Sequence, residues 1–117
     1  MAGLSTHVLD TSSGKPAAGM RIDFSELDGG QWKLIRTIRT NADGRTDGPL
    51  LAADAMRTGQ FMLEFHVAAY FRGLGTQLPE PPFVDVVPLR FGIADRAAHY
   101  HVPLLCSPWS YGTYRGS

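Results

Sequence analysis

Two histidines stand close together near the end of the chain, in the alternating segment His99–Cys106. In a strand, His99 and His101 project from the same face, with their Cα atoms roughly 6 to 7 Å apart. Either ring could act as a general base, because an unperturbed histidine titrates close to neutral pH. A His-x-His pair also occurs in zinc sites, but a catalytic zinc needs a third protein ligand, and no neighbouring residue in the sequence supplies one. Ordinary surface histidines are the third interpretation.

The other two histidines lie in separate strand patterns. His7 shares a face with Ser5 in the segment Leu4–Asp10, and a lone histidine in such a strand is usually structural. His66 shares a face with Glu64, and we expect it to be solvated or paired with a neighbouring side chain. Considered alone, neither position identifies a reaction.

Arg45 is a candidate for binding a polar ligand. It follows the turn sequence Asn41–Gly44, and Asp43 or Asp47 would pair with it if it were simply exposed. Alternatively, its planar guanidinium offers a bidentate fork to carbonyl or carboxylate oxygens. The final segment Tyr114–Ser117 follows an aromatic strand pattern with no polar extension, so we expect it to be docked and not frayed.

Short strands joined by tight turns must position these side chains. The 13 glycines and 8 prolines fall between short alternating segments and do not gather into a linker. The alternation places Met20, Ile22 and Phe24 on one buried face, and it does the same for alternate residues from Phe61 to Val67. This spacing predicts an all-β sandwich or small barrel. The segments that we expect to be strands are Leu4–Asp10, Met20–Ser25, Trp32–Thr40, Phe61–Val67, Phe83–Ile93, His99–Cys106 and Trp109–Tyr114.

A few segments depart from this pattern. Ala68–Gly75 lacks β-branched residues and ends in glycine, which predicts a two-turn helix. Leu50–Met56 fits a short helix or a loop. Pro103 lies inside a strand pattern, and because proline cannot donate to a ladder we expect an edge strand or a bulge there. Cys106 is the only cysteine, so we expect a small buried hydrophobe and no intrachain disulfide.

Composition and charge limit the classes of function. The 117 residues include 11 Lys+Arg and 11 Asp+Glu, and 44% are hydrophobic, which predicts one globular domain over residues 1–117. The scattered cations form no basic stripe, so we expect no nucleic-acid partner and no anionic membrane partner. No run approaches the ~20 apolar residues of a membrane helix, and Met1–Gly3 leads into a strand pattern without the features of a signal peptide. We therefore expect a cytoplasmic protein.

Four motifs follow one another along nearly the whole chain: LSTHVLD at Leu4–Asp10, GRTDGPL at Gly44–Leu50, HYHVPLL at His99–Leu105 and YRGS at Tyr114–Ser117. Each motif alone is only modestly specific. Together, in this order, they resemble the transthyretin-related proteins, which are the 5-hydroxyisourate hydrolases of purine breakdown.

The resemblance implies a transthyretin-like, two-sheet β-sandwich of about eight strands with one short helix. It also implies a homotetramer, a dimer of dimers with its sites at the dimer–dimer interface in a central channel. An interface site agrees with the chain length, because a domain of this size leaves little room for a deep internal cavity. The resemblance implies no cofactor and no metal. By resemblance, the catalytic residues are His7, Arg45 and His101, and the substrate-binding residues are His7, Arg45, Tyr114, Arg115, Gly116 and Ser117.

The implied activity is hydrolytic opening of a ring amide in 5-hydroxyisourate, which gives 2-oxo-4-hydroxy-4-carboxy-5-ureidoimidazoline. A neutral histidine takes a proton from the attacking water while a donor stabilises the developing oxyanion. His7 and His101 can divide these roles, and the sequence does not assign the base to either. Arg45 would orient substrate oxygens and lower histidine pKa values. The hydroxyl or terminal carboxylate of Ser117 could hold the substrate or the water.

Two other functions remain open. Transthyretin shares this fold and holds thyroid hormones in its tetramer channel, so a small-ligand carrier without catalysis is the main alternative. A carrier does not require two histidines, an arginine and the Tyr114–Ser117 ending together, which favours the hydrolase. A metal-dependent activity through His99 and His101 is the third possibility. The end of the chain shows no peroxisomal address, so we expect the cytoplasm of a bacterium.

Overall fold

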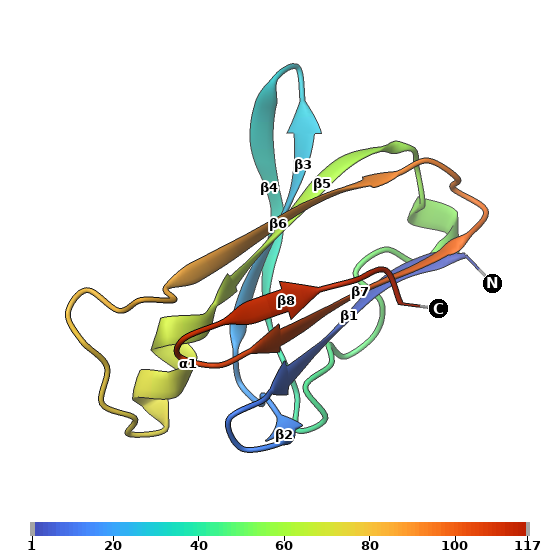
Figure 1. Cartoon of the computed structure of the whole chain (residues 1–117). Coiled ribbons are helices and arrows are strands. Elements are labelled where there is room, and N and C mark those ends of the chain that lie inside the picture. Colours follow the sequence, from blue (N-terminus) through green and yellow to red (C-terminus); the bar gives the residue numbers. More distant parts are fainter. Residues whose placement is uncertain (1, 117) are drawn as a thin grey trace.

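The computed structural model describes residues 2–116, and its strands form two four-stranded sheets that pack face to face (Figure 1). The strands are β1 (Gly3–Asp10), β2 (Lys15–Pro16), β3 (Arg21–Asp28), β4 (Gln31–Arg39), β5 (Gly59–His66), β6 (Val86–Ile93), β7 (His99–Cys106) and β8 (Tyr111–Thr113). The first sheet has the order β2-β1-β7-β8, and the second has the order β4-β3-β5-β6. The expected two-sheet sandwich of about eight strands with one short helix is confirmed.

The core lies between the two sheets, where alternating residues face inward. Met20, Ile22 and Phe24 are fully buried, as predicted, and so are the alternate residues of β5 from Phe61 onward. The rings of Phe24 and Phe61 stack with their centroids 5.8 Å apart, across the β3–β5 pair. The inner faces are largely apolar, with few buried polar residues such as Thr6 and Asp10, so most polar strand residues lie on the outer faces.

The long pairing between β1 and β7 is parallel, whereas every other strand pair is antiparallel. It runs from the Gly3–His99 pair to the Asp10–Cys106 pair. The whole second sheet separates these two strands along the chain, so a hairpin cannot join them. This pairing sets the first and the third motif side by side.

Pro103 lies in the central strand β7, so the predicted edge position or bulge is wrong. Backbone groups of alternate residues point to the same neighbouring strand, and the carbonyl of His101 already faces the end of the chain, where it accepts the Gly116 N–H. The backbone nitrogen of Pro103 therefore also points toward the side of β8. The β7–β8 ladder begins only at the next pair, Leu104–Thr113. The missing N–H costs no ladder hydrogen bond there, and the Pro103 carbonyl accepts from the Thr113 hydroxyl at 2.7 Å.

The helix α1 (Val67–Gly73) confirms the predicted helix, displaced by one or two residues. It ends in a Schellman arrangement, in which the Gly75 N–H bonds to the Arg72 carbonyl and the Thr76 N–H to the Phe71 carbonyl. Gly75 has φ +85°, which a glycine adopts without strain. No helix in residues 2–116 has the length and apolar character needed to cross a membrane.

Some smaller elements differ from the predicted ones. Leu50–Met56 contains only the 3-10 turn η1 (Ala53–Ala55). The two-residue β2 is not among the predicted strands, and β8 is shorter than the predicted Trp109–Tyr114. These are edge elements with few ladder bonds, so alternation alone gives a weak signal for them.

Candidate active site

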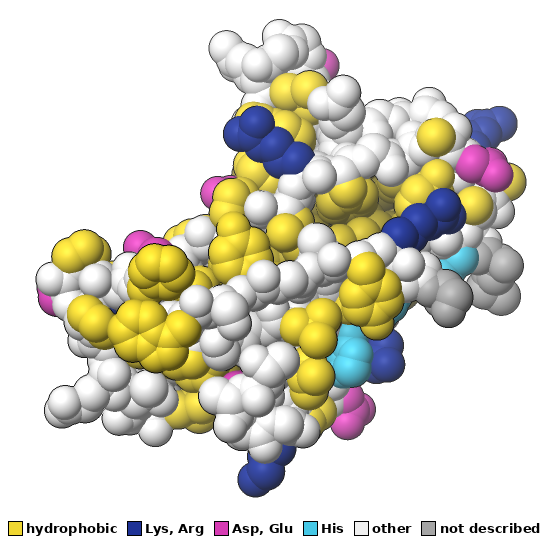
Figure 2. Space-filling model, viewed as in Figure 1, with side chains coloured by type: hydrophobic (Ala, Val, Ile, Leu, Met, Phe, Trp, Pro, Cys, Tyr) yellow, Lys and Arg dark blue, Asp and Glu magenta, His cyan; other side chains and the backbone are white. Residues whose placement is uncertain are grey.

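The register of β1 and β7 brings polar side chains together on the outer face of the first sheet. Ser5 lies opposite His101, and Gly3 lies opposite His99. His7 is opposite Pro103 and follows Ser5 on the same face. Four polar side chains from two distant motifs therefore share one patch of solvent-facing sheet. Figure 2 shows histidine side chains at the surface close to basic ones.

Ser5 connects the two histidines of β7. Its Oγ lies 2.8 Å from His101 Nδ1 and 3.4 Å from His99 Nε2. Ser5 was not among the functional residues predicted from the sequence. Its shared face with His7 was visible in the alternation, but its contact with His101 depends on a strand pairing that alternation does not reveal.

The loop before Arg45 is held against β1 by main-chain contacts. The Val8 N–H donates to the Gly44 carbonyl at 2.8 Å, and Arg45 forms an isolated antiparallel bridge with His7. Within the loop, Asn41 Oδ1 accepts the Arg45 N–H at 3.1 Å. Gly44 has φ +73°, and a Cβ there would lie 2.5 Å from the Val8 carbonyl oxygen. Only glycine satisfies both the backbone conformation and the close approach, and this fixes Arg45 beside His7.

The end of the chain is docked up to Gly116, as predicted. The Gly116 N–H donates to the His101 carbonyl at 2.7 Å. A Cβ at Gly116 would lie 2.6 Å from His101 Cδ2, so a side chain at this position would displace the imidazole. The backbone of Gly116 therefore packs closely against the His101 ring.

A cavity of about 350 Å³ lies where these elements meet. Its lining comes from Ser5, Arg45, His99, His101, Tyr114 and Gly116. Four residues predicted for the site are therefore brought together, with His7 beside them through its bridge to Arg45. Ser117 lies outside the described residues.

Arg115 is not brought to this cavity. Its guanidinium lies over the Tyr100 ring, 4.1 Å from the centroid, and donates to the His99 carbonyl at 3.3 Å. Arg115 lines a second, mainly apolar cavity of about 490 Å³ between β6 and β8. Figure 2 shows hydrophobic side chains in the hollow between the β3–β4 hairpin and β8.

The surroundings of His101 favour its neutral form. Partial burial lowers the pKa of His101 below its ordinary value, and the charge of Arg45 lowers it further, with smaller effects from His7 and His99. None of the described residues that line the cavity is acidic. A neutral imidazole next to a permanent cation can accept a proton from water, and the cation can stabilise a developing oxyanion.

The rings of His99 and His101 both contact the Ser5 hydroxyl. Within residues 2–116, no three His, Cys, Asp or Glu side chains are grouped so that they could hold a metal ion.

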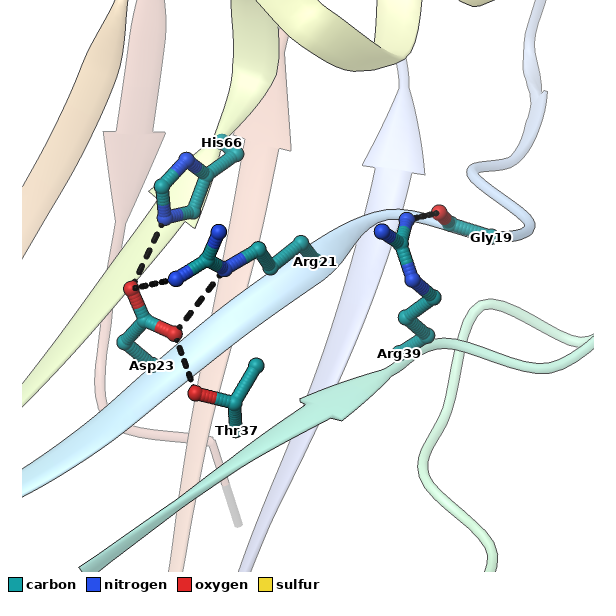
Figure 3. A network of polar contacts seen from close by, with 6 residues as sticks. All are labelled: Gly19, Arg21, Asp23, Thr37, Arg39 and His66. Carbon is teal, nitrogen blue, oxygen red and sulfur yellow. Dashed lines mark hydrogen bonds and ion pairs between the residues drawn. The ribbon is translucent and has the colours of Figure 1, made fainter.

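The remaining histidine and the cysteine lie outside this site. His66 Nε2 donates to Asp23 Oδ2 at 2.9 Å, so the expected pairing exists, but across to β3 and not with Glu64. Thr37 and Arg21 bind the same carboxylate, and Figure 3 shows this network on the second sheet. Cys106 is buried, as predicted, and burial followed by the charge of Asp10 raises the pKa of its thiol to about 12.

Both the sequence and the fold match known proteins. Residues 4–116 match the model of the HIUase/Transthyretin family. A 5-hydroxyisourate hydrolase of Rhizobium meliloti is 57% identical over 114 residues, which cover 97% of this chain and 95% of the relative.

Solved structures show the same fold. The 5-hydroxyisourate hydrolase of Klebsiella pneumoniae superposes with a TM-score of 0.81 at 32% identity, covering 100% of both chains. Sea bream transthyretin in complex with thyroxine superposes with a TM-score of 0.85 at 30% identity, covering 97% of this chain and 93% of that one. The family match over almost the full length, together with these relatives, shows that the chain belongs to the HIUase/transthyretin family.

Proposed function

We propose that this protein hydrolyses 5-hydroxyisourate, the activity for which its relatives from Rhizobium meliloti and Klebsiella pneumoniae are named. The observation that carries the proposal is the polar cavity, in which His101 with a lowered pKa lies beside Arg45. We infer that the product is 2-oxo-4-hydroxy-4-carboxy-5-ureidoimidazoline.

The reaction adds water across one ring amide. A neutral histidine, His7 or His101, takes a proton from the water as its oxygen bonds to the ring carbonyl carbon. Arg45 stabilises the oxyanion that develops on the carbonyl oxygen. When the carbon–nitrogen bond breaks, the ring nitrogen receives a proton from the histidine that acts as the acid, and the carbonyl carbon ends as a carboxylate.

The other predicted residues bind the substrate in this scheme. Tyr114 and Gly116 line the cavity and give it shape. Ser117 follows Gly116 in the sequence and stays a predicted contact for the substrate or the water. Arg115 would contact the substrate only after leaving the Tyr100 ring, so its binding role also stays a prediction.

The assembly that we propose is a homotetramer, a dimer of dimers with the sites at the dimer–dimer interface. Arg45, His99 and Tyr114 are exposed in one chain, which supports the assembly because a second copy covering them would keep bulk water out of the site while leaving room for the reacting water. We also propose a bacterial cytoplasmic location, which agrees with the bacterial source of the closely matching hydrolase from Rhizobium meliloti.

The test is the disappearance of 5-hydroxyisourate, generated from urate by urate oxidase and corrected for spontaneous decay. We expect the protein to accelerate it at catalytic concentrations. Replacing His7, Arg45 or His101 with Ala should lower turnover by about 10² to 10⁴-fold. His66→Gln is the matched control, because His66 lies in the network on the other sheet. Wild-type rates in the three site variants would refute the site assignment.

A carrier function is the second candidate, since sea bream transthyretin has a similar fold and is described with thyroxine. The polar lining of the cavity favours the hydrolase over this candidate. If the intact assembly fails to accelerate the reaction, a binding screen with thyronines and purine analogues would test the carrier.

A further inference from the structure

Ser5 occupies a central position among the polar side chains of the cavity. It lies in direct register with His101, and its Oγ is 2.8 Å from the Nδ1 of that ring. The same Oγ lies 3.4 Å from His99 Nε2, so one hydroxyl contacts both histidines of β7. Neither His99 nor Ser5 has a part in the reaction scheme given above.

The contact between Ser5 Oγ and His101 Nδ1 determines which ring nitrogen of His101 is free to contact water or substrate. With Nδ1 engaged by Ser5, Nε2 is the ring nitrogen left for water or substrate. On the other side of the ring, the backbone of Gly116 blocks movement, since even a Cβ there would lie 2.6 Å from Cδ2. The imidazole is therefore held between a hydroxyl and a glycine.

His99 supplies the second anchor for the hydroxyl. Gly3 lies opposite His99 in the ladder, and the His99 ring extends from β7 toward the Ser5 hydroxyl of β1. A serine hydroxyl has one proton and two lone pairs, so it can donate to one ring while accepting from the other. The three side chains form a chain of hydrogen bonds in which the position of one proton depends on the others.

We propose that Ser5 is a positioning residue for His101, which holds Nδ1 so that Nε2 faces the reacting atoms, with His99 anchoring the Ser5 hydroxyl. This inference rests on the proposed function, because it assigns Ser5 a part in the same reaction. Ser5 lines the cavity, but in this arrangement its hydroxyl is engaged by the two histidine rings. It acts on the rate through the orientation and tautomer of His101.

The kinetic test compares Ser5→Ala with Ser5→Thr. Loss of the hydroxyl should lower kcat by about ten- to hundredfold with KM nearly unchanged, because a misplaced catalytic ring slows the chemical step without removing a substrate contact. Thr retains the hydroxyl and suits a strand, so Ser5→Thr should restore most of kcat. His99→Ala should lower kcat less, and the double variant Ser5→Ala/His99→Ala should be no slower than Ser5→Ala.

Thr6→Val is the control for strand integrity. Thr6 is the next residue of β1 on the inner face, where its hydroxyl donates to the Val102 carbonyl at 2.7 Å. Valine has nearly the same shape, so this variant loosens the β1–β7 pair without touching the cavity. We expect its kcat to equal that of the wild type.

A measurement independent of activity separates this inference from the proposed function. The ring ¹⁵N resonances of His101 report its tautomer, and they should change in Ser5→Ala and stay close to wild type in Ser5→Thr. If the wild type fails to hydrolyse 5-hydroxyisourate but these resonances behave as expected, the proposed function is wrong and the contact stands without its catalytic role. Unchanged resonances in Ser5→Ala, failure of Thr to restore kcat, or an equal loss in Thr6→Val would overturn the inference.

Discussion

At the scale of single residues, the proposed mechanism requires that the His101 imidazole stay neutral beside the positive charge of Arg45. Burial first, and then Arg45, lower the pKa of His101 below its ordinary value of 6.5. The proton-accepting form therefore predominates at neutral pH and is lost only as the pH falls through this lowered value. We expect kcat/KM to show an acidic limb below about pH 6.5.

Changing Arg45 should move that limb in a way that depends on charge. Arg45→Met removes the cation, so the pKa of His101 should rise and the acidic limb should shift to higher pH. Arg45→Lys keeps the charge but loses the planar fork, so the rate should fall at every pH while the limb stays in place. The measurements are kcat/KM from about pH 5 to 8 and an NMR titration of His101. Equal shifts in the two variants would show that the charge of Arg45 does not act on His101.

The residue pattern predicted part of this site. Arg45, His101, Tyr114 and Gly116 were expected from the motifs and do line one cavity. Ser5 was not singled out, because alternation shows which face a residue occupies and not which strand lies beside it. Arg115 was expected to bind substrate, which stays a prediction; its guanidinium lies over the Tyr100 ring of β7, a contact between separate segments of the first sheet that local alternation does not reveal.

At the scale of elements, the last described segment of the chain lies against the His101 ring at Gly116, which has no side chain. Gly116→Ala should push the His101 ring away from its position, since the new Cβ would lie 2.6 Å from Cδ2. We expect kcat/KM to fall by about ten- to hundredfold with little loss of thermal stability. Gly73→Ala is the matched control, because a Cβ at Gly73 meets nothing within 4 Å. An unchanged rate in Gly116→Ala would show that the reaction does not depend on the close packing of Gly116 against the His101 ring.

A separate network joins three strands of the second sheet. Asp23 of β3 accepts hydrogen bonds from Thr37 of β4, His66 of β5 and Arg21 (Figure 3). Burial alone would raise the pKa of Asp23, but these hydrogen bonds outweigh it and lower the pKa from 3.8 to about 2. Because the folded pKa lies below the unfolded one, this stabilisation is complete above the unfolded value and is lost as the pH falls toward about 2.

Asp23→Asn should therefore destabilise the protein at neutral pH, by about 1 to 3 kcal/mol, and the difference from wild type should shrink in acid. Thermal unfolding at a fixed protein concentration, at neutral pH and in acid, measures both effects. Asp28→Asn is the control, since Asp28 pairs with Lys33 where both side chains are more than 60% exposed. A constant difference between Asp23→Asn and wild type across this pH range would contradict the expected role of the carboxylate.

Elements were predictable wherever a buried face imposed alternation. β3 and β5 of the second sheet follow it closely, whereas β4 has no buried residue. The prediction for Pro103 was wrong because a sequence cannot show where a neighbouring ladder begins. β7 tolerates the proline because the ladder with β8 starts one residue later. The parallel pairing of β1 with β7 was also outside the reach of local pattern, and this pairing brings the site together.

At the scale of the whole molecule, the outer face of the first sheet carries apolar residues beside the polar ones. Leu9 and Leu105 are paired across β1 and β7 on the same face as His7 and His101, and both are half-buried. A second copy that covers these leucines would also cover the cavity and exclude water from it. Exclusion of water would strengthen the electrostatic effect of Arg45 on the developing oxyanion.

Leu105→Glu should therefore weaken both assembly and activity, because it places a charge in the proposed dimer–dimer interface without touching the cavity lining. We expect a smaller species in size-exclusion chromatography with light scattering, and a loss of kcat/KM that parallels the loss of the tetramer. Leu34→Glu is the matched control, since Leu34 is 60% exposed on β4 of the other sheet. A Leu105→Glu protein that is smaller than the tetramer and retains the full rate would show that one chain, or a dimer, holds a complete site.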